Sequence, residues 1–137
     1  MKTHFQLNDK EFEKQFSTCE LNQELFNHEA HLRLAWIHIN AYGIDRALTN
    51  IQSQLQNFVS FVGAKDKYNT TLTIVAVKIV YHFILKSKSH DFKGFIIEFP
   101  QLNNSFKEFI KAHYSFDIFN SEKAKMTFLE PDLLAFD

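Results

Sequence analysis

Apolar residues between positions 44 and 62 recur at the three- and four-residue steps that bring side chains to one face of an α-helix. They are Ile44, Ala47, Leu48, Ile51, Leu55, Phe58, Val59 and Val62. The polar residues among them are expected elsewhere on the helix surface. These are Gln52, Ser53, Gln54, Gln56 and Asn57. The spacing predicts one long amphipathic helix, which Gly63 ends.

Capping residues predict two helices before this stripe. Asn8 and Glu11 have the spacing of a capping box, which favours a short helix over residues 9–19. Asn27 is a good N-cap for a second helix, and Gly43 stands where a glycine ends one. We therefore expect the second helix to occupy the whole segment between these two residues.

The segment TLTIVAVKIVYHFILK, residues 71–86, is rich in β-branched residues, which favour a strand. It runs for sixteen residues without a turn signal, however, and strands are usually about 4–8 residues long. We predict a helix that is buried on most sides. Lys78 and His82 interrupt its apolar surface, so they either face solvent or point into a polar cavity, and we expect them to be exposed.

Shorter helices are predicted after residue 90. Asp91 caps one, and a capping box of Ser105 with Glu108 begins another. Ser121 is expected to cap a last turn before the C-terminal tail.

The chain has only three glycines and two prolines in 137 residues, which is few for the tight turns of a sheet protein. We predict an all-α fold with three long helices and several short C-terminal ones. No linker or composition shift appears, so residues 1–137 are expected to form a single helical domain.

Composition also limits the partners and the setting. A formal charge of −1 provides no long-range field for nucleic acid or an anionic membrane, and the apolar stretches are too short and polar to span a bilayer. The N-terminus is short and polar, which argues against a signal peptide. Cys19 is the only cysteine, so it forms no internal disulfide. These features favour a cytoplasmic protein.

The segment HEAHLRLAW, residues 28–36, carries the most chemistry. His28 and His31 are three residues apart at the start of the second helix, so they share one side of it. Such a pair holds a metal when other elements supply further ligands. No partner motif stands out, although His82 or His113 would serve as a third ligand. A divalent metal at His28 and His31 is therefore a minority interpretation, and no cofactor is the favoured one.

The same histidines also fit a site without metal. A helix start offers unpaired N–H groups and the positive end of the helix dipole, which attract an anion or a polar ligand group. The dipole would lower the pKa of a nearby histidine and leave it neutral. Arg33 lies on a different side of the helix and is expected to form a structural salt bridge, and Trp36 is expected in the core.

The motif FNHEAHLRLAW resembles the F-x-H-x-x-H-L-R-L-A-W segment of a family of small, uncharacterised, all-helical bacterial proteins. The segment KYNTTLT and the tail that contains P-D-L agree with it, so the resemblance covers roughly residues 12–136. Members of this family often read Y-H-E-T where this chain has Tyr68, Asn69, Thr70 and Thr71. The resemblance thus implies a site shared by the starts of the second and fourth helices, in which this chain replaces a histidine and a glutamate.

We therefore predict a pocket for a small molecule or anion, formed by His28, His31, Tyr68 and Asn69. His31 would act as a base or contact the ligand. Tyr68 would line the pocket and donate a hydrogen bond, and the Asn69 amide would orient the ligand. The sequence does not decide whether the protein is an enzyme.

Two other hypotheses remain. The chain would be a protein-interaction or homodimerisation module if the phenylalanines between residues 92 and 119 were exposed. It would be a metal-dependent enzyme if a third ligand joined the histidine pair.

Overall fold

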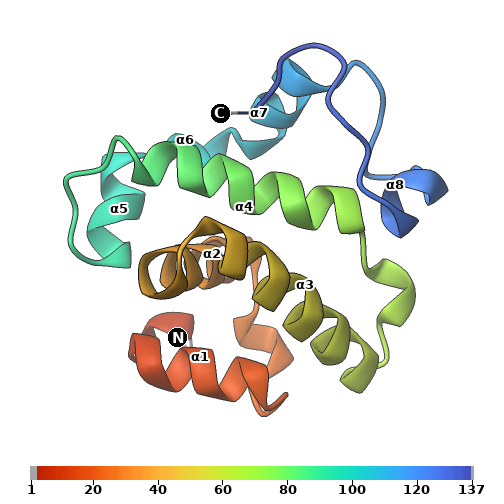
Figure 1. Cartoon of the computed structure of the whole chain (residues 1–137). Coiled ribbons are helices and arrows are strands. Elements are labelled where there is room, and N and C mark those ends of the chain that lie inside the picture. Colours follow the sequence, from red (N-terminus) through yellow and green to blue (C-terminus); the bar gives the residue numbers. More distant parts are fainter. Residues whose placement is uncertain (1–2, 137) are drawn as a thin grey trace. The chain divides into compact units, whose positions relative to one another are not determined.

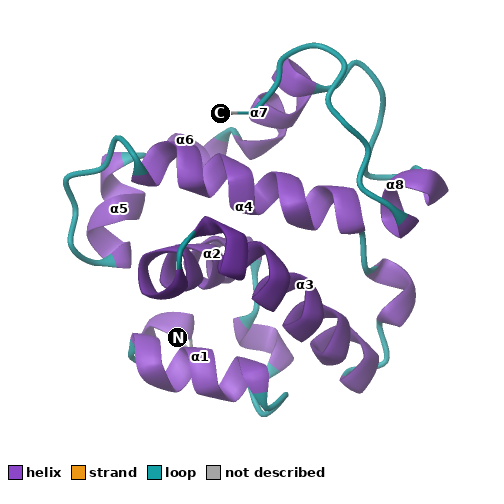
Figure 2. Cartoon of the chain, in the orientation of Figure 1, coloured by secondary structure: helices purple, strands orange, loops and turns teal. Residues whose placement is uncertain are grey.

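The computed structural model describes residues 3–136, and every regular element in that range is a helix. Figure 2 shows these helices joined by loops. The predicted all-α fold is confirmed, with three long helices followed by short ones. Within the described range, no helix has the length and apolar character needed to cross a membrane.

The chain folds into two compact units, with the boundary between Tyr68 and Asn69. Each unit is described by itself. The expectation of a single domain stays a prediction.

The first unit contains the three predicted N-terminal helices and three short 3-10 turns. The helices are α1 (Asp9–Ser17), α2 (His28–Tyr42) and α3 (Ile44–Phe61). The turns are η1 (His4–Gln6), η2 (Gln23–Leu25) and η3 (Lys65–Lys67). The helices α2 and α3 form the most extensive helix pair, and α1 packs against both (Figure 1).

Aromatic side chains fill the core of the first unit. The ring of Phe16, which is fully buried, lies 4.9 Å from the ring of Phe58 and 4.7 Å from the ring of Phe26, measured between centroids. Phe26 and Phe58 are also in contact, at 5.3 Å. This cluster joins α1, α3 and the segment before α2, so the apolar burial of the three rings holds the unit together. The predicted core position of Trp36 is confirmed.

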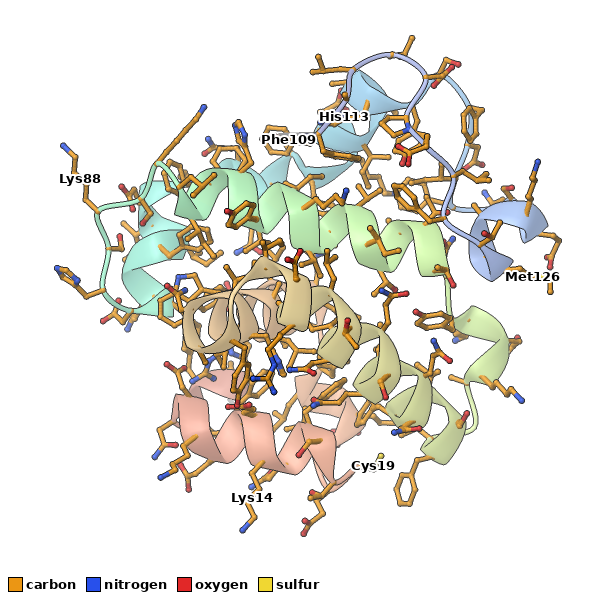
Figure 3. The ribbon with its side chains drawn as sticks, in the orientation of Figure 1. Lys14, Cys19, Lys88, Phe109, His113 and Met126 are labelled. Carbon is orange, nitrogen blue, oxygen red and sulfur yellow. The ribbon has the colours of Figure 1, made fainter. Side chains whose placement is uncertain are left out.

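The second unit is built on α4 (Thr70–Ile84), which confirms the predicted helix in the β-branched segment. It continues with α5 (Phe92–Glu98), α7 (Phe106–His113) and α8 (Glu122–Met126). The helix α6 is a single turn over Gln101–Asn104 that begins directly after Pro100, and the sequence did not predict it. Figure 3 shows the exposed Met126 side chain pointing away from α8.

The tail after α8 is held to the second unit by individual polar contacts. The hydroxyl of Thr71 donates to the carbonyl of Thr127 at 2.8 Å and accepts from the amide of Leu129 at 3.1 Å. The buried hydroxyl of Tyr114 donates to the carbonyl of Leu129 at 2.7 Å. Without regular structure of its own, the tail depends on these bonds to satisfy its backbone.

The second predicted capping box and the predicted exposure of Lys78 and His82 need correction. The Asn8–Glu11 capping box is present, but Ser105 makes no side-chain cap bond, so the second predicted capping box is wrong. Lys78 and His82 are half-buried rather than exposed. The Lys78 ammonium lies 5.5 Å from the ring centre of Phe128, because aromatic rings of the tail cover this part of α4.

The turn between α2 and α3 depends on Gly43. Its dihedral angles, φ 86° and ψ 166°, lie in a region that is almost exclusive to glycine. A Cβ atom added there would meet no atom within 4 Å, so only the backbone resists substitution. We expect Gly43→Ala to lower the free energy of unfolding by about 1–3 kcal/mol in urea titrations.

The matched control is Ser53→Ala, at an exposed position in the middle of α3. This replacement should change the free energy of unfolding by less than about 0.5 kcal/mol. Equal stability of the two variants would show that the backbone at Gly43 carries no strain.

Candidate functional site

The predicted histidine pair begins α2. The side chain of Asn27 accepts from the amide of Ala30 at 2.9 Å, which confirms Asn27 as the N-cap. His28 and His31 follow on the first turn of the helix, and both side chains are exposed. The ring of His31 lies against the ring of Phe26, with 3.9 Å between centroids. Phe26 thus supports one side of His31 while the ring remains accessible.

The electrostatics favour a neutral His31. Desolvation by the surrounding protein, and then the charge of His28, lower the pKa of His31 to about 4. Water that reaches the exposed part of the ring weakens this shift, but the ring is neutral at pH 7 in either case. Within residues 3–136, His31 makes no side-chain hydrogen bond. Its nitrogens are therefore free to accept from, or donate to, a bound molecule.

His38 follows His31 by seven residues on α2, so the two lie on the same side of the helix, two turns apart. It is fully buried, and desolvation lowers its pKa from the ordinary value. Its Nδ1 atom lies 3.5 Å from the side-chain nitrogen of Asn50 on α3. If the Asn50 amide donates to Nδ1, the other ring nitrogen, Nε2, carries the proton of the neutral ring.

Three buried side-chain atoms of the first unit have no hydrogen-bond partner within residues 3–136. They are Nε2 of His38, Oε1 of Gln54 and the hydroxyl oxygen of Tyr68. Gln54 follows Asn50 by four residues, so the two side chains share a face of α3. The sequence placed Gln54 on the surface, but it is half-buried. Each unpaired atom costs about 1–3 kcal/mol, so the three together call for an explanation.

Tyr68 and Asn69 differ in whether their side-chain polar atoms are already used in hydrogen bonds. Tyr68 is half-buried, and its hydroxyl is among the unpaired atoms. Asn69 is buried; its oxygen caps α4 by accepting from Leu72 at 2.9 Å, and its nitrogen donates to the carbonyl of Ile118 at 2.8 Å. Asn69 is thus engaged in structural bonds within the second unit.

Metal ligands do not gather in the part of the chain that is described. Among residues 3–136, no group of three or more His, Cys, Asp or Glu side chains is placed to hold a metal ion. Two histidines were candidates for a third ligand. The Nδ1 atom of His113 lies 2.6 Å from the carbonyl oxygen of Leu134, and the ring stacks on that of Phe136. His82 is half-buried on α4.

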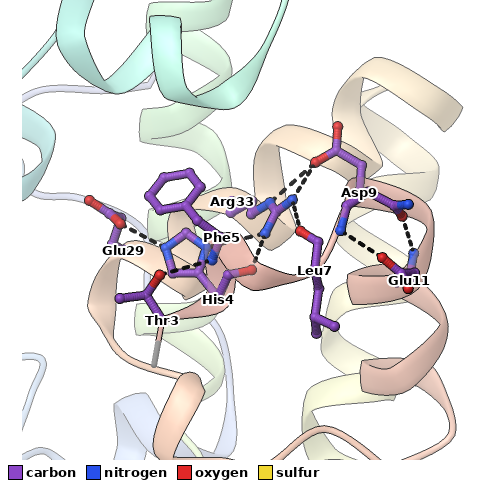
Figure 4. Close-up of polar contacts among 9 residues, drawn as sticks. Thr3, His4, Phe5, Leu7, Asp9, Glu11, Glu29 and Arg33 are labelled. Carbon is purple, nitrogen blue, oxygen red and sulfur yellow. Dashed lines mark hydrogen bonds and ion pairs between the residues drawn. The ribbon is translucent and has the colours of Figure 1, made fainter. Parts of the chain in front are cut away.

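A second polar cluster surrounds Arg33, the residue for which we predicted a structural salt bridge (Figure 4). That bridge is confirmed: Nη2 of Arg33 lies 2.9 Å from Oδ1 of Asp9, and Nε lies 3.2 Å from the same oxygen. Nη2 also donates to the carbonyl of Leu7 at 2.8 Å, and Nη1 donates to the carbonyl of His4 at 2.7 Å. With Nδ1 of His4 at 3.3 Å from Nη1, all five N–H groups of this buried guanidinium have a partner.

His4 is fully buried between Arg33 and Glu29. A guanidinium only donates, so Nδ1 of His4 accepts from it, and Nε2 carries the proton that is donated to Glu29 at 2.7 Å. Desolvation is the main reason that the pKa of His4 lies below its ordinary value, although Glu29 opposes the shift. Both ring nitrogens are used, so His4 has a structural role.

The sequence did not indicate His4, because a histidine in a polar N-terminal segment has no spacing relation to Arg33. Gln54 was missed for a different reason. Glutamine on a helix is usually exposed, and only the packing of the helices determines which polar positions are covered.

The hypothesis of an interaction surface depended on exposed phenylalanines between residues 92 and 119. Phe92 and Phe95 are buried, and Phe116 is the exposed phenylalanine of this range, at 41%. The other four phenylalanines of this range are half-buried, so an interaction surface and homodimerisation both stay predictions.

Comparison of the chain with family models, curated proteins and solved structures gives no match. The resemblance to the F-x-H-x-x-H-L-R-L-A-W family stays a prediction.

Arg33 provides a test of the polar cluster around it. Lysine keeps the charge of Arg33 but offers three N–H donors instead of five, so the carbonyls of His4 and Leu7 and the carboxylate of Asp9 compete for them. We expect Arg33→Lys to lower the free energy of unfolding by about 2–4 kcal/mol in urea titrations. Lys14→Arg, at an exposed position of α1, is the control and should have almost no effect. A loss below about 0.5 kcal/mol in Arg33→Lys would show that the cluster adds little stability.

The histidines also predict how stability depends on pH. The pKa values of the buried His4 and His38 are lowered from 6.5, so the folded chain binds fewer protons than the unfolded chain below that pH. The free energy of unfolding should be constant above pH 7.5 and fall between pH 6.5 and 5, by at most about 1.4 kcal/mol per pH unit for each buried histidine.

Urea titrations at pH 7.5, 6.5 and 5 measure this dependence, and His38→Gln should reduce its slope whatever it does to the stability at pH 7.5. A stability that is unchanged or higher at pH 5 would contradict neutral, buried histidines.

Proposed function

We propose that the chain binds a small polar molecule through the first unit, at a site that includes His31 and Tyr68. The observation that supports this proposal is that three buried polar atoms have no partner in the described part of the chain: His38 Nε2, Gln54 Oε1 and the Tyr68 hydroxyl. A native chain rarely leaves such groups unpaired unless water or a ligand satisfies them. A binding site explains them because it sacrifices stability to keep hydrogen-bonding atoms available.

The available groups favour an uncharged ligand. His31 and His38 are neutral at pH 7, Gln54 provides a carbonyl acceptor, and Tyr68 provides a hydroxyl that both donates and accepts. None of these four side chains carries a charge that would compensate an ionised ligand, so a molecule with both a donor and an acceptor suits them best. His28 would lie beside this site, one helical turn from His31. A ligand contact from Asn69 stays a prediction, because its amide is already used in structural bonds.

The proposal includes a cytoplasmic setting. Its support is the single free cysteine, Cys19, since a reducing compartment is where an unpaired thiol is ordinary.

The unpaired hydroxyl of Tyr68 makes a direct prediction for the ligand-free protein. Tyr68→Phe removes a buried polar atom that has no partner, so we expect the free energy of unfolding to rise by about 1 kcal/mol. The matched control is Tyr114→Phe, which removes a buried hydroxyl that donates to Leu129 at 2.7 Å. This control should lose about 1 kcal/mol. A loss of stability in Tyr68→Phe as large as that in Tyr114→Phe would mean that the Tyr68 hydroxyl has a structural partner.

Ligand binding is tested by thermal unfolding of the wild type with a panel of uncharged amides, polyols and nitrogen heterocycles. A compound that binds the folded chain raises its Tm. This increase should be lost in Tyr68→Phe and in the double variant His28→Ala/His31→Ala, and it should be retained in Tyr114→Phe. An unchanged increase in the double variant would contradict the assignment of the site to the start of α2.

A further inference from the structure

The segment before α1 is attached to α2 by polar contacts. We call residues 3–8 the strap. Its 3-10 turn is closed by the amides of Gln6 and Leu7, which donate to the carbonyls of Thr3 and His4 at 3.1 Å each. Its polar attachments to α2 include the two carbonyls that accept from Arg33 and the imidazole ring of His4 (Figure 4). These bonds are a large part of what keeps the strap in place.

The ring of His4 fits its place in one protonation state. Arg33 offers only N–H groups, so Nδ1 must present a lone pair to Nη1 at 3.3 Å. A proton taken up from water at Nδ1 would place an N–H group against an N–H group and a positive ring beside a positive guanidinium. The contact cannot survive this change, because donor faces donor and the ring is fully buried.

The charged groups around the ring act in both directions. On α2, the carboxylate of Glu29 favours a protonated ring, whereas Arg33 opposes it. On α1, Asp9 binds Arg33 and compensates part of its charge. Burial and Arg33 thus lower the pH at which the ring takes up its second proton, and Glu29 raises it. The donor-only guanidinium of Arg33 determines what that proton does to the contact.

We propose that the strap is released from α2 when His4 takes up a proton, while the helices of the first unit stay folded. The fully buried imidazole then leaves its place between Arg33 and Glu29 and reaches water, where a charged ring is stable. The carbonyls of His4 and Leu7 leave with it, and the side of Arg33 that they covered becomes accessible. Asp9 keeps its bond to Arg33 because it belongs to α1. Mild acid thereby exposes a basic surface on the first unit that is covered at neutral pH.

The test is the backbone order parameter of Phe5, Gln6 and Leu7, measured by NMR relaxation at pH 7.5 and pH 5. At pH 7.5 these amides should be about as rigid as those of α2, near 0.85, and at pH 5 they should fall below about 0.6. The amides of α2 and α3 should keep their values at both pH values. Release of the strap is thereby distinguished from unfolding of the unit.

Two variants of the full chain complete the test. In His4→Gln, the side-chain oxygen can accept from Arg33 and the nitrogen can donate to Glu29, as the neutral ring does, so the strap should stay ordered at both pH values. In Glu29→Gln, the group that favours the proton is lost, so release should move to a lower pH. A wild-type strap that stays ordered at pH 5 would overturn the proposal. So would a His4→Gln strap that is released as in the wild type, or a loss of order in α2 together with the strap.

Discussion

The guanidinium of Arg33 dictates much of the structure at the N-terminal end of the chain. It is buried, it has five donors and no acceptor, and burial of a charge without partners is costly. The chain satisfies it with two carbonyls, an imidazole nitrogen and a carboxylate from a segment more than twenty residues away. The rings of Phe5 and Phe12 lie near its charge, at 5.7 and 4.9 Å. The position of α1 on α2 follows from these requirements as much as from apolar burial.

The buried polar groups of the first unit differ in how completely they are satisfied. Around Arg33, every donor has a partner, and such a network gives stability and a unique arrangement. Within residues 3–136, by contrast, one buried atom each of His38, Gln54 and Tyr68 lacks a partner. Because a native chain rarely leaves buried polar atoms unpaired, these three support the proposal of a binding site. This contrast is the physical basis for the proposed binding site.

Most of the fold could be predicted from local patterns. The stripe from Ile44 predicted α3, and the length of the β-branched segment distinguished α4 from a strand, because both signals depend only on nearby residues. Asn8, Asn27, Asp91 and Ser121 were correctly identified as caps. Ser105 has the same sequence signal, but its backbone does not direct the side chain to the helix amides. The ends and caps of short C-terminal helices depend more on tertiary packing, which a local sequence pattern does not describe.

The candidate site could be predicted only in part. The helical spacing placed His31 and His38 on one side of α2, since spacing alone determines that relation. Desolvation and the charge of His28 lower the pKa of His31, and the contribution of the helix dipole stays a prediction. The roles of Gln54 and His4 depend on contacts between segments far apart in sequence, so no local pattern predicts them.

The most direct test of the proposed site is a crystal structure of the wild type bound to the uncharged compound that raises its Tm most. The account predicts that this compound contacts the Tyr68 hydroxyl and His31, and that it satisfies at least one of the two other unpaired atoms. A compound bound elsewhere, with the Tyr68 hydroxyl, Gln54 and His38 all hydrogen-bonded to other protein groups, would contradict it.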